Sequence, residues 1–123
     1  MLALIGARDP AVRRMLCRCL EKQGWITLPA RDGPALAYLA PRLRPELILS
    51  DASLSGSPDG AAAARFIRGP WSSAPIVLMT GDCRRSALLR LEGWSVLEKP
   101  FTLAELMTAA QGQLPPAADR ARP

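Results

Sequence analysis

The stretch Leu47-Ile48-Leu49-Ser50-Asp51 places a carboxylate directly after a short apolar run. The run predicts a buried central strand over Glu46–Ser50, and the loop that follows extends from Ala52 to Gly60. In open sheets of parallel strands, ligands bind beyond the carboxyl ends of the strands. Asp51 is therefore the first candidate for a functional side chain.

Two later apolar runs also end at a polar residue. Thr80 follows the run Pro75–Met79, and Lys99 follows the run Ser95–Glu98. Because the carboxyl ends of parallel strands meet at one edge of a sheet, we expect an acid, a hydroxyl and an amine in one anion-binding pocket. Each residue also has a plainer explanation: Asp51 as a cap, Thr80 as a strand end, and Lys99 as part of a turn before proline.

Short apolar runs alternate with helical patterns five times, which indicates strand–helix units around a parallel sheet. The expected strands are Leu2–Gly6, Trp25–Leu28, Glu46–Ser50, Pro75–Met79 and Ser95–Glu98. The expected helices start at Asp9-Pro10, Asp32-Gly33-Pro34, Ala61, Gly81 and Thr102, the last with a capping box to Glu105. We expect one α/β domain over residues 1–114, a doubly wound three-layer sandwich, and a disordered tail or linker over residues 115–123.

Composition excludes several classes of function. The 123 residues contain no histidine and three cysteines without metal-site spacing, which excludes histidine bases, histidine ligands and histidine-containing triads. The net charge is +5, but the arginines are scattered and no aromatic residue interleaves with a basic run, so direct nucleic-acid binding is not expected. No apolar run approaches the roughly 20 residues of a membrane span, and the start lacks signal-peptide features. We expect a cytoplasmic protein.

Four landmarks in this order resemble the receiver domain of bacterial response regulators. They are Asp9–Arg14, Leu47–Asp51, Pro75–Gly81 and Lys99–Leu106. The resemblance covers about Leu2 to Leu114 and implies a flavodoxin-like (βα)5 sheet of five parallel strands. It makes Asp51 the expected phosphoacceptor, with Thr80 and Lys99 supporting the phosphate site. It implies a signalling module of a two-component or phosphorelay pathway rather than an enzyme.

Three positions depart from the family pattern. The acidic pair that helps to bind Mg²⁺ in receivers falls on Ala7 and Arg8, and Asp9 is better explained as a helix cap. Mg²⁺ is held by carboxylates and waters, so the ion expected from the family should bind weakly here, with Asp51 as its carboxylate ligand if it binds at all. Val96 stands at the position of the family's aromatic switch residue, so the usual threonine-to-ring switch is not expected.

Two positions of the Arg8 side chain remain open at this stage. In the first, the guanidinium pairs with Asp51 as a tethered substitute for the metal ion, and phosphorylation should then be slow or absent. In the second, the Arg8 side chain points to solvent.

We therefore expect an atypical receiver that accepts a phosphoryl group at Asp51 inefficiently or conditionally and acts by docking a partner protein. Expected partners are a sensor histidine kinase, a phosphotransfer protein or a downstream effector, and the domain is expected to be a monomer or weak dimer. The alternatives are a phosphorylation-independent interaction domain and a small-ligand binder or enzyme on the same sheet. The expected partner surface comprises Arg84, Arg85, Leu88, Trp94, Val96 and Leu103.

Overall fold

The computed structural model describes residues 1–69 and 75–112. One parallel sheet has the strand order β2-β1-β3-β4-β5. Its strands are β1 (Leu2–Gly6), β2 (Ile26–Ala30), β3 (Leu47–Asp51), β4 (Ile76–Thr80) and β5 (Ser95–Glu98). The helices are α1 (Pro10–Lys22), α2 (Gly33–Leu43), α3 (Gly60–Ile67), α4 (Cys83–Leu91) and α5 (Leu103–Gly112). The expected doubly wound α/β fold is confirmed, while the expected tail lies outside the described residues.

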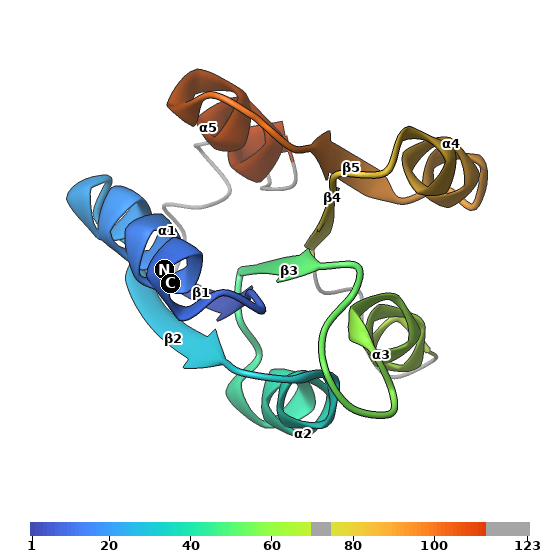
Figure 1. Cartoon of the computed structure of the whole chain (residues 1–123). Helices are drawn as coiled ribbons and strands as arrows, with labels where there is room; N and C mark the ends of the chain where they lie inside the picture. The colour runs from blue at the N-terminus through green and yellow to red at the C-terminus, as the bar shows by residue number, and fades with distance from the viewer. Residues whose placement is uncertain (70–74, 113–123) are drawn as a thin grey trace.

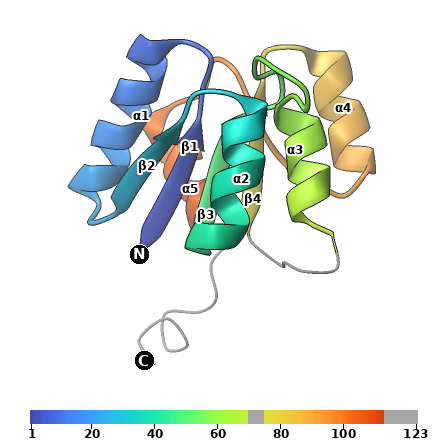
Figure 2. The same cartoon turned by 90° about the horizontal axis from the view of Figure 1, so that it is seen from below.

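Helices cover both faces of the sheet, giving three layers (Figure 1). Helices α1 and α5 lie on one face, and α2, α3 and α4 lie on the other. Helices α2 and α3 lie side by side, as the second view shows (Figure 2). Within the described ranges, no helix has the length and apolar character needed to cross a bilayer.

Strand β3 is buried along its whole length, as expected for a central parallel strand that has helices on both faces. Leu47 and Leu49 pack with α1 and α5, whereas Ile48 packs with α2, α3 and α4. This alternation fixes the strand between two apolar cores, so that Asp51 ends the strand at a defined place on the sheet edge.

Aspartates begin four of the five helices. The carboxylates of Asp9, Asp32, Asp59 and Asp82 each accept a backbone N–H from the first turn of α1, α2, α3 and α4. Helix α5 begins with the predicted capping box, in which Thr102 and Glu105 exchange hydrogen bonds of 3.0 and 3.1 Å. The four capping aspartates are therefore hydrogen-bonded to the helix backbone.

Some element boundaries differ from those expected. Strand β2 is Ile26–Ala30 because Trp25 is buried ahead of it against the α1 side of the sheet. Strands β3 and β4 each run one residue further than expected, to Asp51 and Thr80. Helix α4 starts at Cys83 because Asp82 takes the capping position. Both candidate polar residues are thus the last residues of their strands.

Candidate functional site

A pocket of about 150 Å³ opens at the carboxyl edge of the sheet. The register pairs Asp51 of β3 with Met79 of β4, and Thr80 with Glu98 of β5, so the residues at these strand ends converge. The structure brings the three expected side chains, Asp51, Thr80 and Lys99, to this one edge. The pocket is lined by Arg8, Asp51, Ser53, Met79, Thr80, Gly81 and Lys99.

Asp51 is buried, with 5% of its surface exposed. Its Oδ2 accepts a hydrogen bond of 2.9 Å from the backbone N–H of Arg8, and its Oδ1 lies 2.5 Å from Nζ of Lys99. Among the described residues Oδ1 has no directed hydrogen-bond donor, so the ammonium holds it as an ion pair at close range. The buried negative charge is therefore balanced by Lys99, whose side chain remains 38% exposed at the pocket mouth.

Thr80 is buried and connects the pocket to the start of α4. Its Oγ1 accepts a hydrogen bond of 3.1 Å from the backbone N–H of Asp82, and its carbonyl accepts one of 2.8 Å from Lys99 N–H. The Thr80 hydroxyl thus lies beside both the pocket and the N-terminus of α4. A hydroxyl in this place can donate to an anion in the pocket while its oxygen contacts the helix.

The residues after β1 supply backbone rather than acids. Ala7 is buried, and its carbonyl accepts a hydrogen bond of 2.9 Å from the Arg13 guanidinium. Arg8 contacts Asp51 through its backbone N–H, while its side chain is exposed and makes no ion pair with Asp51 within the described ranges. The hypothesis that the Arg8 guanidinium pairs with Asp51 is therefore wrong for this structure, because Lys99 occupies that role. Asp9 caps α1 through a 2.8 Å bond to Ala11 N–H, as predicted.

The acids present do not fit a magnesium site built from several carboxylates. Asp51 is the one carboxylate among the pocket-lining residues, and both of its oxygens already have partners. Residues 1–69 and 75–112 contain no cluster of three or more acidic, cysteine or histidine side chains able to hold a metal ion. Mg²⁺ in proteins relies on carboxylates and retained waters in octahedral geometry. The two carboxylates that would complete such a site are replaced by Ala7 and Arg8.

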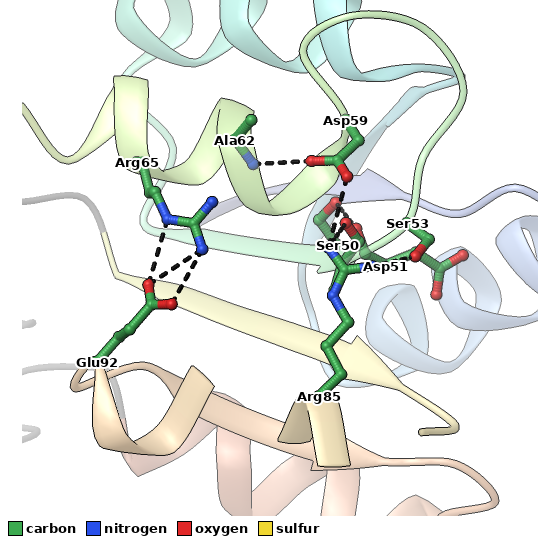
Figure 3. Close-up of polar contacts among 9 residues, drawn as sticks. Ser50, Asp51, Ser53, Asp59, Ala62, Arg65, Arg85 and Glu92 are labelled. Carbon is green, nitrogen blue, oxygen red and sulfur yellow. Dashed lines mark hydrogen bonds and ion pairs between the residues drawn. The ribbon is translucent and has the colours of Figure 1, made fainter. Parts of the chain in front are cut away.

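Arg85 occupies a place that the sequence did not reveal. It was expected on an exposed partner surface, but its guanidinium reaches the loop between β3 and α3 (Figure 3). It donates to Ser53 Oγ, to the Ala52 carbonyl at 3.1 Å and to Asp59 Oδ2 at 3.4 Å. The two residues that follow Asp51 are thereby tied to α4.

Trp94 also differs from its expected place on the partner surface. Only 7% of its surface is exposed, because its ring packs in the apolar core and the Arg68 guanidinium stacks on it, 3.9 Å from the ring centroid. Its indole N–H donates to Glu92, which also pairs with Arg65 of α3 (Figure 3). These contacts make Trp94 a structural link between α3 and the α4–β5 turn.

The remaining expected surface positions divide by exposure. Leu88 and Leu103 are exposed as expected, whereas Val96 is partly buried against the core. Val96 supplies no ring at the position of the family switch. Of the six positions expected on the partner surface, Arg84, Leu88 and Leu103 are therefore exposed.

Comparison with known proteins identifies the class. Residues 4–111 match the response regulator receiver domain family, and the chain belongs to this family. Receiver domains are signalling modules of two-component systems, so the family assignment does not favour the alternatives of a phosphorylation-independent interaction domain and of a small-ligand binder or enzyme.

Individual relatives agree with this class. The DNA-binding response regulator MtrA of Mycolicibacterium smegmatis is 31% identical over 114 residues, which cover 90% of this chain and 49% of that protein. The chain spans between a quarter and a half of the length of the curated relatives it matches first.

Two solved structures also align with the fold. The receiver domain of sensor histidine kinase PA1611 from Pseudomonas aeruginosa, with magnesium in its active-site cleft, has a TM-score of 0.79 and 26% identity, covering 91% of this chain and 95% of that one. The BeF3-activated receiver domain of Klebsiella pneumoniae RstA has a TM-score of 0.81 and 28% identity, covering 92% and 97%. Both carry the same sheet and helix arrangement as this chain.

Proposed function

We propose that Asp51 accepts a phosphoryl group from a phosphohistidine on a partner protein. The observation that carries this proposal is the buried Asp51 carboxylate, held 2.5 Å from Lys99 in a pocket open at the sheet edge. An Asp51 carboxylate oxygen forms a bond to phosphorus while the bond from phosphorus to the partner's imidazole nitrogen breaks. The electron pair of the broken bond stays on that nitrogen, which takes a proton from solvent. Such transfer depends mainly on positioning and charge neutralisation, for which this pocket supplies fixed groups.

The pocket residues have separate roles in this reaction. Lys99 pairs with Asp51 before transfer and with the phosphoryl oxygens after it. The Thr80 hydroxyl donates a hydrogen bond to the same phosphoryl oxygens. Backbone N–H groups around the exposed Gly81 donate further hydrogen bonds to them. Arg8 N–H holds Oδ2 and so fixes the plane of the carboxylate.

The charges in the pocket support a reaction in which the protein's own cationic side chains take the place of a metal ion. Two cationic residues, Arg8 and Lys99, line the pocket with the Asp51 carboxylate. A phosphorylated aspartate has lost its carboxylate charge and carries about −1.5 to −2 on the phosphoryl group, which two cations neutralise. Mg²⁺ is expected from the family, but the described residues that line the pocket supply no second carboxylate to bind it. We expect transfer to be slower than it would be with a metal ion, because the exposed Arg8 guanidinium is not held in place by Asp51.

We propose a sensor histidine kinase or phosphotransfer protein as the donor, and a downstream effector protein as the recipient of the signal. We also propose a cytoplasmic location, because these partners act there. The docking surface we propose consists of Arg84, Leu88 and Leu103, which are exposed near α4 and α5. MtrA is named a DNA-binding response regulator, but this chain covers only 49% of it, and we assign no DNA contact to the receiver.

The phosphoacceptor is tested by incubating the full chain with acetyl phosphate and measuring its intact mass. We expect one phosphoryl group on part of the wild-type population and none on Asp51→Asn. Asp9→Asn is the matched control, because asparagine also caps helices and Asp9 takes no part in the pocket. Equal labelling of Asp51→Asn and the wild type would overturn the proposal, and loss of labelling in Asp9→Asn would assign Asp9 to the site.

A further inference from the structure

One guanidinium on α4 makes three contacts with the loop that follows Asp51. One terminal nitrogen of Arg85 donates to Ser53 Oγ, and the other donates to the Ala52 carbonyl and to Asp59 Oδ2 (Figure 3). Ala52 and Ser53 directly follow Asp51, and Ser53 lines the pocket. Arg85 therefore links the pocket wall to the first turn of α4.

The adjacent arginine shows that this link is specific. Arg84 contacts Asp82 only through its backbone N–H at 2.9 Å, and within the described ranges its exposed side chain makes no hydrogen bond or ion pair. The fork of Arg85 requires a planar group with several donors, because two nitrogens meet three acceptors at once. Lysine would keep the charge but could not make this set of contacts.

We propose that Arg85 is the positioning residue that couples the state of Asp51 to α4. The proposal rests on phosphorylation of Asp51, which replaces the single carboxylate charge with about −1.5 to −2 on a phosphoryl group beside Ser53. The resting counter-charge of Arg85 is Asp59, at 3.4 Å and with its side chain 41% exposed, and an exposed pair of this kind is weak. The new dianion therefore competes with Asp59 for the guanidinium and draws the first turn of α4 toward the pocket.

Helix α4 buries one polar side chain in the resting conformation. The Ser86 hydroxyl is fully buried and has no hydrogen-bond partner among the described residues. A buried polar group without a partner lowers the stability of the conformation that holds it. A shift of α4 that gives this hydroxyl a partner would thus favour the displaced position. Val96 has no ring to make this connection from β5. Among the described residues, Arg85 and the Thr80–Asp82 hydrogen bond both join the pocket to the start of α4, and of the two only Arg85 also holds the loop after Asp51.

Coupling of this kind is reciprocal. If the charge on Asp51 moves α4 through Arg85, then a partner bound to α4 changes how readily Asp51 is modified. The exposed side chains of Leu88 and Leu91 lie on the same helix as Arg85 and are available to such a partner. A docking protein could therefore adjust phosphorylation without touching the pocket.

The test follows backbone amide signals of the full chain by nuclear magnetic resonance, with beryllofluoride as the probe. The Gly81 amide reports the pocket, and the amides of Leu88 to Leu91 report α4. We expect both sets to shift in the wild type and in Arg84→Ala. In Arg85→Ala and Arg85→Lys, the Gly81 shift should remain while the α4 shifts fall by about threefold or more. Equal α4 shifts in Arg85→Ala and Arg84→Ala would overturn the proposal, and a wild-type response in Arg85→Lys would show that charge alone suffices.

A second readout separates this proposal from the phosphoacceptor assignment. If beryllofluoride leaves Gly81 of the wild type unchanged, the phosphoryl function of the pocket fails and the resting link is tested by amide hydrogen exchange. We expect Arg85→Ala to raise exchange of residues 52–59 by about threefold over Arg84→Ala, because three contacts are lost. Equal exchange in the two variants would show that Arg85 does not hold this loop.

Discussion

Nζ of Lys99 lies 2.5 Å from Oδ1 of Asp51, and among the described residues no other carboxylate lines the pocket around this pair. The aspartate therefore experiences cations and a backbone N–H, without a neighbouring negative charge to repel it. Clustered acids destabilise a folded protein through repulsion, whereas a lone buried acid beside lysine gains from its partner. This relationship sets how the pocket responds to substitution.

Removal of the Asp51 charge should lower stability. We expect Asp51→Asn to reduce the free energy of unfolding by about 1 kcal/mol, a modest figure because Lys99 is partly exposed. Lys99→Ala should cost at least as much, since it leaves a buried carboxylate without its cation. Urea unfolding of both single variants and the double variant measures the coupling. A gain in stability for Asp51→Asn would show that the desolvation cost of the buried carboxylate exceeds its gain from Lys99.

The close approach of α3 to β3 should make Gly60 intolerant of a side chain. A Cβ on Gly60 would lie 1.8 Å from the Asp51 carbonyl oxygen, so the helix or the strand end must move. We expect Gly60→Ala to cost about 3 kcal/mol or more, or to prevent folding. Gly112→Ala is the control, because a Cβ there meets nothing within 4 Å. Similar thermal unfolding of the two variants would contradict this account.

The contacts of Glu92 should make part of the stability pH-dependent. The indole N–H of Trp94 and the Arg65 guanidinium hold the pKa of Glu92 below its ordinary value of 4.5. A carboxyl group whose pKa is lowered by folding stabilises the protein at pH values above its unfolded-state pKa. This contribution is lost as the pH falls through the folded-state pKa. We expect Glu92→Gln to have a lower Tm than the wild type at pH 7. Thermal scans should show the difference narrowing below pH 4.5, and a difference that is constant with pH would exclude the ion pair.

The sequence predicted the site through backbone geometry. Asp51, Thr80 and Lys99 were identified because residues at the carboxyl ends of parallel strands meet at one sheet edge. This convergence follows from the backbone and does not depend on side-chain conformation. The caps at Asp9 and Asp32 were predictable for a similar reason, since each precedes a helix start and acts within three residues of itself. Local rules and strand order therefore carry most of the site.

Contacts made by long side chains between distant segments were not predictable. Arg85 reaches residues 26 to 33 positions earlier in the chain, and its helical pattern marks it as exposed. Trp94 was expected at the surface, but Arg68 and Glu92 enclose it. The sequence also left two positions open for the Arg8 side chain, and in the structure this side chain is exposed while the backbone N–H contacts Asp51. Side-chain direction at such positions depends on the neighbours that the fold supplies.

The most direct measurement is the rate at which acetyl phosphate labels Asp51 in Mg²⁺ and in the presence of a chelator. If Lys99 and Arg8 supply the positive charge, labelling should proceed slowly in both, with rates that differ by no more than about threefold. Lys99→Ala should then lose labelling under both conditions. Labelling that requires Mg²⁺, or wild-type protein that takes no phosphoryl group under either condition, would contradict the account.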